Sequence, residues 1–432
     1  MREFLKIAEV TLGCRVNIFD TAAILDDLQK SKKVQLVDPM AKPDVYLINT
    51  CAVTEGAERD CRNTIRKYQR LNPTARFIVT GCYAQLKPEE IAKNFGVDFV
   101  VGTTQREKIP ELITQMSFVN GISPQIHVQN IMKLKPKIYN SLSTFTTHTR
   151  AFLKIQDGCN EFCTFCIIPF TRGRSRIVPI SVVIDQINNL VLKGFKEVVL
   201  TGIHLGDYRN HFVNSIEALE KTDLKRFRLS SLEPFDVTDD LLTVLSQSSK
   251  FCPYFHLPLQ SGDDFILKRM KRPYTTQFFK DLVGRIETLF PHVFIGLDLM
   301  LGFPGEDEES YQRTKSFLQS IFWSKAHVFP YSVRKGTSAA SFKDQIPSHI
   351  KKKRVREMIA LSDERLKAFY SRNLNLVLPT LIETSHNGIA RGLTSNYIPV
   401  SLRHSETSKN DLIPVKLLNI SEDKKLVFAE KI

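Results

Sequence analysis

Three cysteines stand within eight residues of the chain, with the spacing C-x3-C-x2-C: Cys159, Cys163 and Cys166. Three thiolates can hold a four-iron cluster and leave one iron without a protein ligand, whereas clusters that only carry electrons usually have four cysteine ligands. An open iron can bind and activate a small molecule, so this spacing indicates an enzyme. A structural zinc site needs a fourth Cys or His at short spacing, and the next ones are His204 and Cys252. Surplus buried thiols are the remaining alternative.

A second group of cysteines follows strand-like runs near the start of the chain. Up to about residue 120, strand-like and helix-like patterns alternate, which is typical of a parallel sheet covered by helices; the strand-like runs are 4–12, 44–50, 76–81 and 98–102. Cys14, Cys51 and Cys82 follow the first three runs. Ligands of such sheets bind beyond the carboxyl ends of the strands, so these thiols are expected to converge. Alternatively they only pack near strand ends, as we interpret Cys61 in the next helical pattern.

The central part of the chain repeats the alternation of strands and helices. Six strand-like runs are separated by helical patterns: 151–156, 197–202, 226–231, 255–259, 294–301 and 326–331. Six such units predict a barrel or an open partial barrel, in which the chemistry lies at the carboxyl ends of the strands. The C-x3-C-x2-C run directly follows the first of these strands.

Two further segments complete the predicted organisation. Residues 120–150 are rich in Lys, Ser and Thr without periodicity and are interpreted as a linker. Residues 350–373 predict a basic helix, either a solvated face or one that faces RNA. From 374 onward, short apolar runs between turn residues predict a small all-β domain, for which RNA binding and dimerisation or capping are the alternatives.

The overall charge favours polyanionic partners. Lysines and arginines exceed acidic residues by 60 − 46 = 14, with a pI of about 9.3, which suits nucleic acid, although a generic basic protein is the other interpretation. No stretch approaches the roughly 20 apolar residues of a membrane span, and the start has no apolar signal region. We therefore expect no membrane partner, reduced cysteines and a cytoplasmic location.

Several motifs together resemble one family. The run DGCNEFCTFC is similar to the cluster motif of radical S-adenosylmethionine (SAM) enzymes, and TLGCRVN, INTCAVT, TGCYAQ, HLPLQSGDDFILKRMKRPYT (256–275) and GFPGE (302–306) narrow the resemblance to the methylthiotransferases. The resemblance implies an α/β protein with three domains. They are an N-terminal flavodoxin-like parallel-sheet domain over 1–120, a central partial (βα)6 TIM-type radical SAM barrel over 145–373, and a C-terminal all-β TRAM RNA-binding domain over 374–432.

Three segments resemble one subgroup, the threonylcarbamoyladenosine tRNA enzymes. They are GCRVN (13–17), the run CIIPFTRGRSR with Arg174, and TGIHLGDY (201–208); SVRKGTSAA (332–340) departs slightly from the usual pattern. The implied reaction is methylthiolation at C2 of N6-threonylcarbamoyladenosine 37 in the tRNA anticodon loop. Methylthiolation of isopentenyladenosine 37 or of a ribosomal protein side chain is the alternative, and a non-catalytic iron–sulfur RNA-binding protein is a third hypothesis.

The resemblance also implies cofactors and partners. Cys159, Cys163 and Cys166 would ligate a 4Fe-4S cluster that cleaves SAM to a 5′-deoxyadenosyl radical. A second 4Fe-4S cluster on Cys14, Cys51 and Cys82 would carry the sulfur, with a second SAM as methyl donor and an electron donor such as flavodoxin or ferredoxin. Residues near the predicted strand ends are candidates for SAM contacts: Gly202, Glu233 and Gln260. The oligomeric state is left open.

Overall fold

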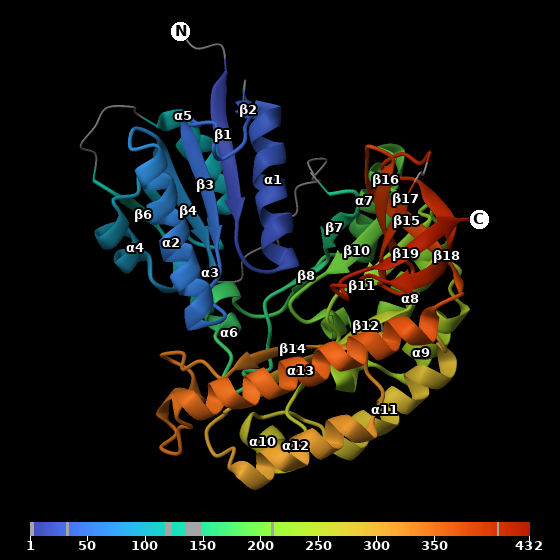
Figure 1. The fold of residues 1–432 in the computed structure, drawn as a ribbon. Helices are drawn as coiled ribbons and strands as arrows, with labels where there is room; N and C mark the ends of the chain where they lie inside the picture. Colours follow the sequence, from blue (N-terminus) through green and yellow to red (C-terminus); the bar gives the residue numbers. More distant parts are fainter. Residues whose placement is uncertain (1–3, 32–33, 117–122, 135–147, 209–210, 404–405) are drawn as a thin grey trace. The chain divides into compact units, whose positions relative to one another are not determined.

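The computed structural model describes residues 4–31, 34–116, 123–134, 148–208, 211–403 and 406–432 (Figure 1). The chain divides into two compact units. The first unit combines Met1–Thr146, Gln156–Val178 and Ser332–Ala340, and the second combines Thr147–Ile155, Pro179–Tyr331 and Ser341–Ile432. The domain boundaries expected from the sequence, 1–120, 145–373 and 374–432, stay a prediction.

The first unit is built on a parallel sheet. Its six strands lie in the order β2-β1-β3-β4-β5-β6, and their bounds are β1 (Leu5–Thr11), β2 (Val34–Leu36), β3 (Val45–Thr50), β4 (Arg76–Gly81), β5 (Phe99–Val101) and β6 (Gln125–His127). Every residue of β3 and β4 is buried, as parallel strands covered on both faces should be. The short β2 and β6 were not predicted, and β6 lies inside the segment that was expected to be a linker.

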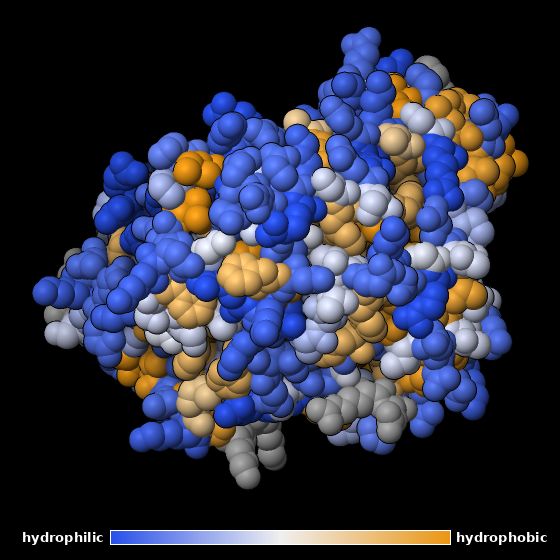
Figure 2. All heavy atoms as spheres, turned by 90° about the horizontal axis from the view of Figure 1, so that it is seen from below, coloured by the Kyte–Doolittle hydropathy of each residue, from blue (hydrophilic) through white to orange (hydrophobic). Residues whose placement is uncertain are grey.

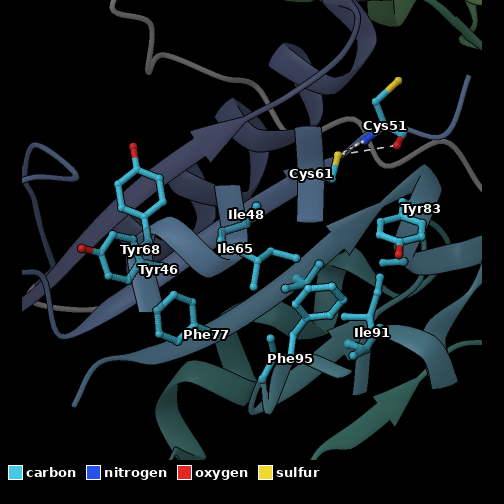
Figure 3. Close-up of a cluster of buried hydrophobic side chains, with 14 of the residues drawn as sticks. Tyr46, Ile48, Cys51, Cys61, Ile65, Tyr68, Phe77, Tyr83, Ile91 and Phe95 are labelled. Atoms are coloured by element: carbon cyan, nitrogen blue, oxygen red, sulfur yellow. Dashed lines mark hydrogen bonds between the residues drawn. The ribbon is translucent and has the colours of Figure 1, made fainter. Parts of the chain in front are cut away.

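Helices cover both faces of this sheet, so the predicted flavodoxin-like arrangement is confirmed. They are α1 (Arg15–Ser31), α2 (Glu55–Leu71), α3 (Cys82–Leu86), α4 (Pro88–Phe95), η1 (Arg106–Lys108) and α5 (Ile109–Gln115). One core joins α2 and α4 to the face of Tyr46, Ile48 and Phe77 (Figure 3). The other joins α1 and α5 to the face of Leu47 and Ile78. The alternation of these neighbours along β3 and β4 follows from the two-residue period of a strand.

The first unit also contains three short elements from the linker and the cysteine loop. They are η2 (Ile131–Lys133), a hairpin of β8 (Gln156–Asp157) with β9 (Arg176–Ile177), and α6 (Ile168–Arg172). This hairpin closes the loop that contains the C-x3-C-x2-C run.

The second unit contains the predicted open barrel, a half-barrel that does not close into a ring. Its six strands are parallel and adjacent in chain order, because two three-stranded sheets are joined by bridges at Phe227↔Phe251 and Ser231↔His256. The strands are β7 (Ala151–Lys154), β10 (Glu197–Thr201), β11 (Arg226–Leu229), β12 (Tyr254–Gln260), β13 (Phe294–Leu301) and β14 (Lys325–Pro330). The helical elements that accompany them are α7 (Ile180–Leu192), η3 (Leu205–Tyr208), α8 (His211–Glu220), η4 (Pro234–Asp236), α9 (Asp239–Gln247), α10 (Asp264–Arg269), α11 (Thr276–Leu289) and α12 (Glu308–Ser320).

The C-terminal part of the second unit is the predicted basic helix followed by a small closed barrel. After η5 (Ser338–Ser341) in the connecting segment, the helix is α13 (Ser348–Asn373). The barrel strands lie in the order β15-β16-β17-β19-β18, with the bounds β15 (Val377–His386), β16 (Ile389–Thr394), β17 (Pro399–Arg403), β18 (Leu412–Ile420) and β19 (Val427–Lys431). Closure removes the exposed edges that an open five-stranded sheet would have.

A buried ionic cluster joins this small barrel to the larger one. Glu197 of β10 is fully buried and pairs with Arg226 at 2.5 Å and Arg228 at 2.9 Å on β11. The two guanidinium groups then donate four hydrogen bonds of 2.6–3.1 Å to backbone carbonyls of the small barrel: Pro379, Leu393, Thr394 and Ser395. Tyr397 adds a ring contact to Tyr254 at 4.3 Å. The small barrel is therefore fixed to the strands by hydrogen bonds from two buried guanidinium groups that Glu197 neutralises in part.

Figure 2 shows how polar and apolar side chains are distributed over one face of the molecule. Hydrophilic residues cover most of the face drawn in Figure 2, with hydrophobic side chains scattered among them. Across the described ranges, no helix has the length and apolar character needed to cross a bilayer.

Candidate active site

The structure brings the three N-terminal cysteines to one edge of the sheet. Cys14 follows β1, Cys51 directly follows β3, and Cys82 begins α3 immediately after β4. Because β1, β3 and β4 are neighbours in a parallel sheet, their carboxyl ends meet at the same edge. The thiols are close enough to interact electrostatically, since Cys82 raises the pKa of both Cys14 and Cys51.

The environment of these thiols disfavours free thiolates. Cys51 and Cys82 are buried, and burial, followed by the nearby Cys82, raises the pKa of Cys51 to about 12. Cys14 is accessible to solvent, yet surrounding protein atoms raise the pKa of its thiol, while the guanidinium of Arg172 acts in the opposite direction. A bound metal would supply the positive charge that deprotonates a coordinating thiol outright.

The donor set of three thiols fits a four-iron cluster with one open iron. No three His, Cys, Asp or Glu side chains in the described part of the chain approach closely enough to share one metal ion. A four-iron cluster spreads its ligands over separate corners of a cube, so its thiolates stand farther apart than the ligands of one ion. Three cysteines on neighbouring strand ends match that donor set.

Two glycines allow the cysteine-bearing turns to approach one another. Gly13 has φ +105°, and a Cβ there would lie 2.9 Å from the Cβ of Cys51. Gly81 has φ +99°, and a Cβ there would lie 2.4 Å from the carbonyl oxygen of Thr50. Both positions need the left-handed region and the small size that only glycine provides.

Cys61 supports the backbone of Cys51 from α2. The amide of Cys51 donates to the Cys61 sulfur at 3.3 Å, and the Cys61 thiol donates to the Cys51 carbonyl at 3.6 Å (Figure 3). Cys61 is fully buried in the core beneath the sheet, and burial raises its pKa to about 11. These contacts agree with the interpretation of Cys61 as a packing residue.

The second cysteine set lies on the loop between β8 and α6. Cys159, Cys163 and Cys166 are all half-buried. The amide of Cys159 donates to the Gly173 carbonyl at 3.1 Å, and the amide of Glu161 donates to the Cys159 sulfur at 3.4 Å. Gly158 (φ +77°) allows this closure, because a Cβ there would lie 2.2 Å from the carbonyl oxygen of Arg174. These contacts therefore hold the loop that contains the three cysteines in a compact conformation.

Aromatic and cationic side chains pack within this loop. Phe162 has φ +48°, its ring lies 4.5 Å from the guanidinium of Arg174, and it meets Phe170 edge to face at 6.1 Å. Arg174, which supported the RNA-modifying subgroup in the sequence, is exposed. The side chain of Phe165 is half-buried.

A buried arginine connects the two cysteine-bearing parts of the first unit. Arg172, the last residue of α6, is fully buried and forms ion pairs at 3.0 Å with Asp20 of α1 and Asp157 of β8. It also donates to the Asn17 side-chain oxygen at 2.5 Å. The sequence analysis missed this residue, because its partner Asp20 is 152 positions away and no local pattern marks the pair.

The segment Ser332–Ala340 also belongs to the first unit. The amide of Ala339 donates to the Thr164 carbonyl of the cysteine loop at 2.8 Å. Arg334 forms a buried ion pair with Glu58 of α2, which also pairs with Lys87 at 2.8 Å. This segment departs from the family's usual pattern, and it nevertheless supports both the loop and α2.

The three candidates for SAM contacts lie in the second unit, at the carboxyl ends of β10, β11 and β12. Gly202 directly follows β10, and its amide donates to the Ser230 hydroxyl at 3.4 Å. The carboxylate of Glu233 is engaged by Arg272, which favours a structural role. Gln260 ends β12 with φ +66°, is buried, and its Oε1 has no hydrogen-bond partner among the described residues. An orphaned buried acceptor on a left-handed residue fits a ligand contact.

The half-barrel places His256 near two other polar side chains. His256 lies 2.9 Å from Asp298, and its ring centre lies 5.3 Å from that of His327. Burial acts to raise the pKa of Asp298, but the nearby His256 outweighs it, so the carboxyl pKa lies below its ordinary value.

Two protein-family models match separate parts of the chain, one in the N-terminal part and one in the central part. Residues 6–102 match the family described as "Uncharacterized protein family UPF0004", and residues 153–318 match the "Radical SAM superfamily". A similar solved structure is that of TsrM from Kitasatospora setae, a radical S-adenosylmethionine methyltransferase with cobalamin and a [4Fe-4S] cluster bound. Its TM-score with this chain is 0.58 at 14% sequence identity, and the match covers 79% of this chain and 74% of the TsrM chain. The half-barrel and its cysteine loop thus define a radical SAM protein.

Sequence relatives narrow this class. The threonylcarbamoyladenosine tRNA methylthiotransferase MtaB of Bacillus subtilis is 41% identical and covers 95% of this chain and 93% of its own length. That of Aquifex aeolicus is 38% identical, with 92% and 96% covered. A tRNA-2-methylthio-N(6)-dimethylallyladenosine synthase of Fusobacterium nucleatum is 32% identical, with 95% and 97% covered. The chain belongs to the radical SAM methylthiotransferase family, in its threonylcarbamoyladenosine tRNA group, which confirms the resemblance found from the motifs.

Proposed function

We propose that this protein methylthiolates C2 of N6-threonylcarbamoyladenosine 37 in the tRNA anticodon loop. The observation that carries the proposal is the presence of two three-cysteine sets, one at the strand ends of the sheet and one on the loop after β8. Each set offers three cysteines as ligands, so each would leave one iron of a 4Fe-4S cluster open. The names of the relatives supply the substrate.

Each group of residues has a defined task in this proposal. Cys159, Cys163 and Cys166 would hold the cluster that binds SAM, and Cys14, Cys51 and Cys82 would hold the second cluster. When bound, these clusters and SAM supply the radical, the sulfur and the methyl group, which is the usual division between cofactor and protein. Gln260 would donate or accept a hydrogen bond with SAM through its side-chain amide. Gly202 and Glu233 would line the same end of the strands.

The protein would bind tRNA through the second unit. α13 exposes several basic side chains: Lys352, Lys353, Arg356, Lys367 and Arg372. These would contact backbone phosphates, which dominate affinity without reading sequence. An anticodon loop suits the chemistry because its bases are unpaired and can be splayed out. The reduced thiols and the tRNA substrate support a cytoplasmic location as part of this proposal, with flavodoxin or ferredoxin as the proposed electron donor.

The cluster assignment is tested with reconstituted, reduced protein. We expect about eight irons per chain and conversion of SAM to 5′-deoxyadenosine, which Cys163→Ala should abolish. Cys61→Ala is the matched control, because it removes a buried thiol of the same unit that is not expected to be a ligand; iron content and SAM cleavage should persist. Wild-type protein that contains four irons, or that forms no 5′-deoxyadenosine, would contradict the assignment.

The substrate is tested by mass spectrometry of tRNA nucleosides from a strain that lacks the gene. We expect loss of the methylthio derivative of threonylcarbamoyladenosine, with its unmodified precursor accumulating. Loss of the isopentenyl methylthio nucleoside instead would assign the chain to the other tRNA group, and loss of neither would remove tRNA as the substrate.

A further inference from the structure

The buried network around Arg172 carries more positive than negative charge. Three guanidinium groups, those of Arg106, Arg172 and Arg176, face two carboxylates, those of Asp20 and Asp157. The nitrogen–oxygen distances are 2.8 Å for Arg106–Asp20, 3.0 Å for both pairs of Arg172, and 3.7 Å for Arg176–Asp157. Three positive and two negative groups leave a formal charge of +1. An uncompensated buried charge is costly, so this site calls for a negatively charged neighbour.

The same network has unused hydrogen-bond donors. Buried N–H groups of all three arginines lack a hydrogen-bond partner among the described residues: Nε and Nη2 of Arg106, Nε of Arg172 and Nε of Arg176. Buried polar groups in native proteins are nearly always satisfied. Surplus donors together with surplus positive charge indicate that an acceptor with negative charge belongs beside this network.

The N-terminal thiols are such neighbours of this network. Arg172 interacts electrostatically with Cys14 and Cys82, and Cys14 and Cys82 are in turn among the groups that hold Arg172 in its charged form. Three thiolates would bring three negative charges to a cluster at this edge of the sheet. Reduction of the cluster would add one more, in an environment where a buried charge is poorly screened by solvent.

Arg172 is also tied to the backbone that positions these thiols. It donates to the side-chain oxygen of Asn17 at 2.5 Å. The amide group of Asn17 donates to the Leu12 carbonyl at 2.7 Å and to the Thr50 carbonyl at 3.1 Å. Leu12 lies two residues before Cys14, and Thr50 directly precedes Cys51, so the network reaches both strand ends.

We propose that Arg172 is a positioning residue for the N-terminal cysteine set: its guanidinium provides the buried positive charge that a cluster on Cys14, Cys51 and Cys82 requires. Arg172 belongs to the segment that contains the other cysteine set, six residues after Cys166. The redox properties of the N-terminal cluster therefore depend on a residue from the segment that binds SAM. This inference rests on the cluster assignment of the proposed function.

The test uses the full chain with Cys159, Cys163 and Cys166 all replaced by Ala, so that only the N-terminal cluster forms. Its reduction potential is measured by redox titration followed by electron paramagnetic resonance. Removing one positive charge within roughly 10 Å, at an effective dielectric constant of about 20, changes such an equilibrium on the order of tenfold. We expect Arg172→Gln to disfavour the reduced cluster by about tenfold, which is about 59 mV for one electron.

Asp157→Asn provides the opposite perturbation, because it removes a negative charge from the same network. We expect it to favour the reduced cluster by a similar factor. Arg174→Gln is the matched control, since it removes an exposed guanidinium from the same segment, and it should change the equilibrium by less than about twofold. Arg172→Lys keeps the charge and should restore a near-parental potential.

The outcomes distinguish an electrostatic role of Arg172 from a purely structural one. Shifts of Arg172→Gln and Asp157→Asn in the same direction, or no shift in either, would overturn the proposal in favour of a purely structural role. If Arg172→Gln takes up no iron, the sign of the Asp157→Asn shift and the potential of Arg172→Lys decide the question. A parent that binds no cluster, instead of about four irons, would contradict the cluster assignment of the proposed function itself.

Discussion

Replacing Glu197 by Gln tests whether the buried ionic cluster joins the two barrels of the second unit. The carboxylate is fully buried and is bound by Arg226 at 2.5 Å and Arg228 at 2.9 Å. The substitution keeps the shape of the side chain and one acceptor oxygen, but it leaves two buried guanidinium groups without an anion. Removing one partner of a buried pair typically costs about 3–5 kcal/mol. Because four carbonyls still accept hydrogen bonds from the arginines, we expect the substitution to lower the free energy of unfolding by about 3 kcal/mol, the lower end of this range.

The chain offers a specific probe for this measurement. Its single tryptophan, Trp323, is buried in the second unit, and its indole donates to the Leu318 carbonyl at 2.8 Å. Urea unfolding followed by tryptophan fluorescence therefore reports on the unit that contains Glu197. The transition midpoint should move to lower urea, and thermal unfolding should shift by roughly 6–12 °C.

Glu383→Gln is the matched control. Glu383 pairs with Arg150 at 2.7 Å, but both side chains are partly exposed, and such pairs contribute about 1 kcal/mol or less. If Glu197→Gln costs no more than Glu383→Gln, the buried cluster does not hold the barrels together. Burial raises the pKa of Glu197, but Arg228, Arg226 and Arg150 outweigh this and lower it below its ordinary value. The contribution of Glu197 should therefore be complete above about pH 4.3 and be lost as the pH falls through its lowered pKa.

Three further perturbations follow from the structure. Burial raises the pKa of Glu306 to about 7, so its contribution to stability is complete below about pH 4.3 and is lost as the pH rises to 7. The unfolding free energy of wild type relative to Glu306→Gln should therefore fall by roughly 3 kcal/mol over that range. A difference that stays constant with pH would refute this. Gly158→Ala should reduce iron content from about eight to about four, because its Cβ would meet the Arg174 carbonyl at 2.2 Å. Gly194→Ala, also at positive φ but with open space around it, should keep all eight. Gln260→Ala should weaken SAM binding about tenfold in equilibrium dialysis, and an unchanged Kd would exclude this contact.

Much of the fold could be predicted because it depends on local periodicity. The buried strands of the sheet and of the half-barrel are continuous apolar runs bounded by turn residues, and their order in the chain determines a parallel arrangement. β2 and β6 escaped prediction because each is a three-residue strand with no buried residue, whereas the equally short β5 is fully buried and apolar. Such short edge strands are defined by pairing with a neighbour, as β6 is with β5, and not by their own sequence.

The cysteines could be found from the sequence because their spacing reports ligand chemistry directly. Their supporting residues could not be found in this way. Arg172, Asp20 and Asn17 form one network only after α6 packs beside α1, and a charged residue in a linear sequence is usually a solvated one. The engagement of Glu233 by Arg272 was equally invisible, because the pair is formed between two different loops.

The division into two units has a consequence for dissecting the molecule. The chain passes from one unit to the other five times, at residues 146, 155, 178, 331 and 340. A fragment that ends at 146 would lack Arg172, which forms a buried ion pair with Asp20 at 3.0 Å. No single cut therefore separates one complete cysteine-bearing unit from the half-barrel. Split-gene complementation or the exchange of whole domains between relatives would have to transfer the three discontinuous segments of the first unit together. The two cysteine sets would therefore have to be transferred in the same step.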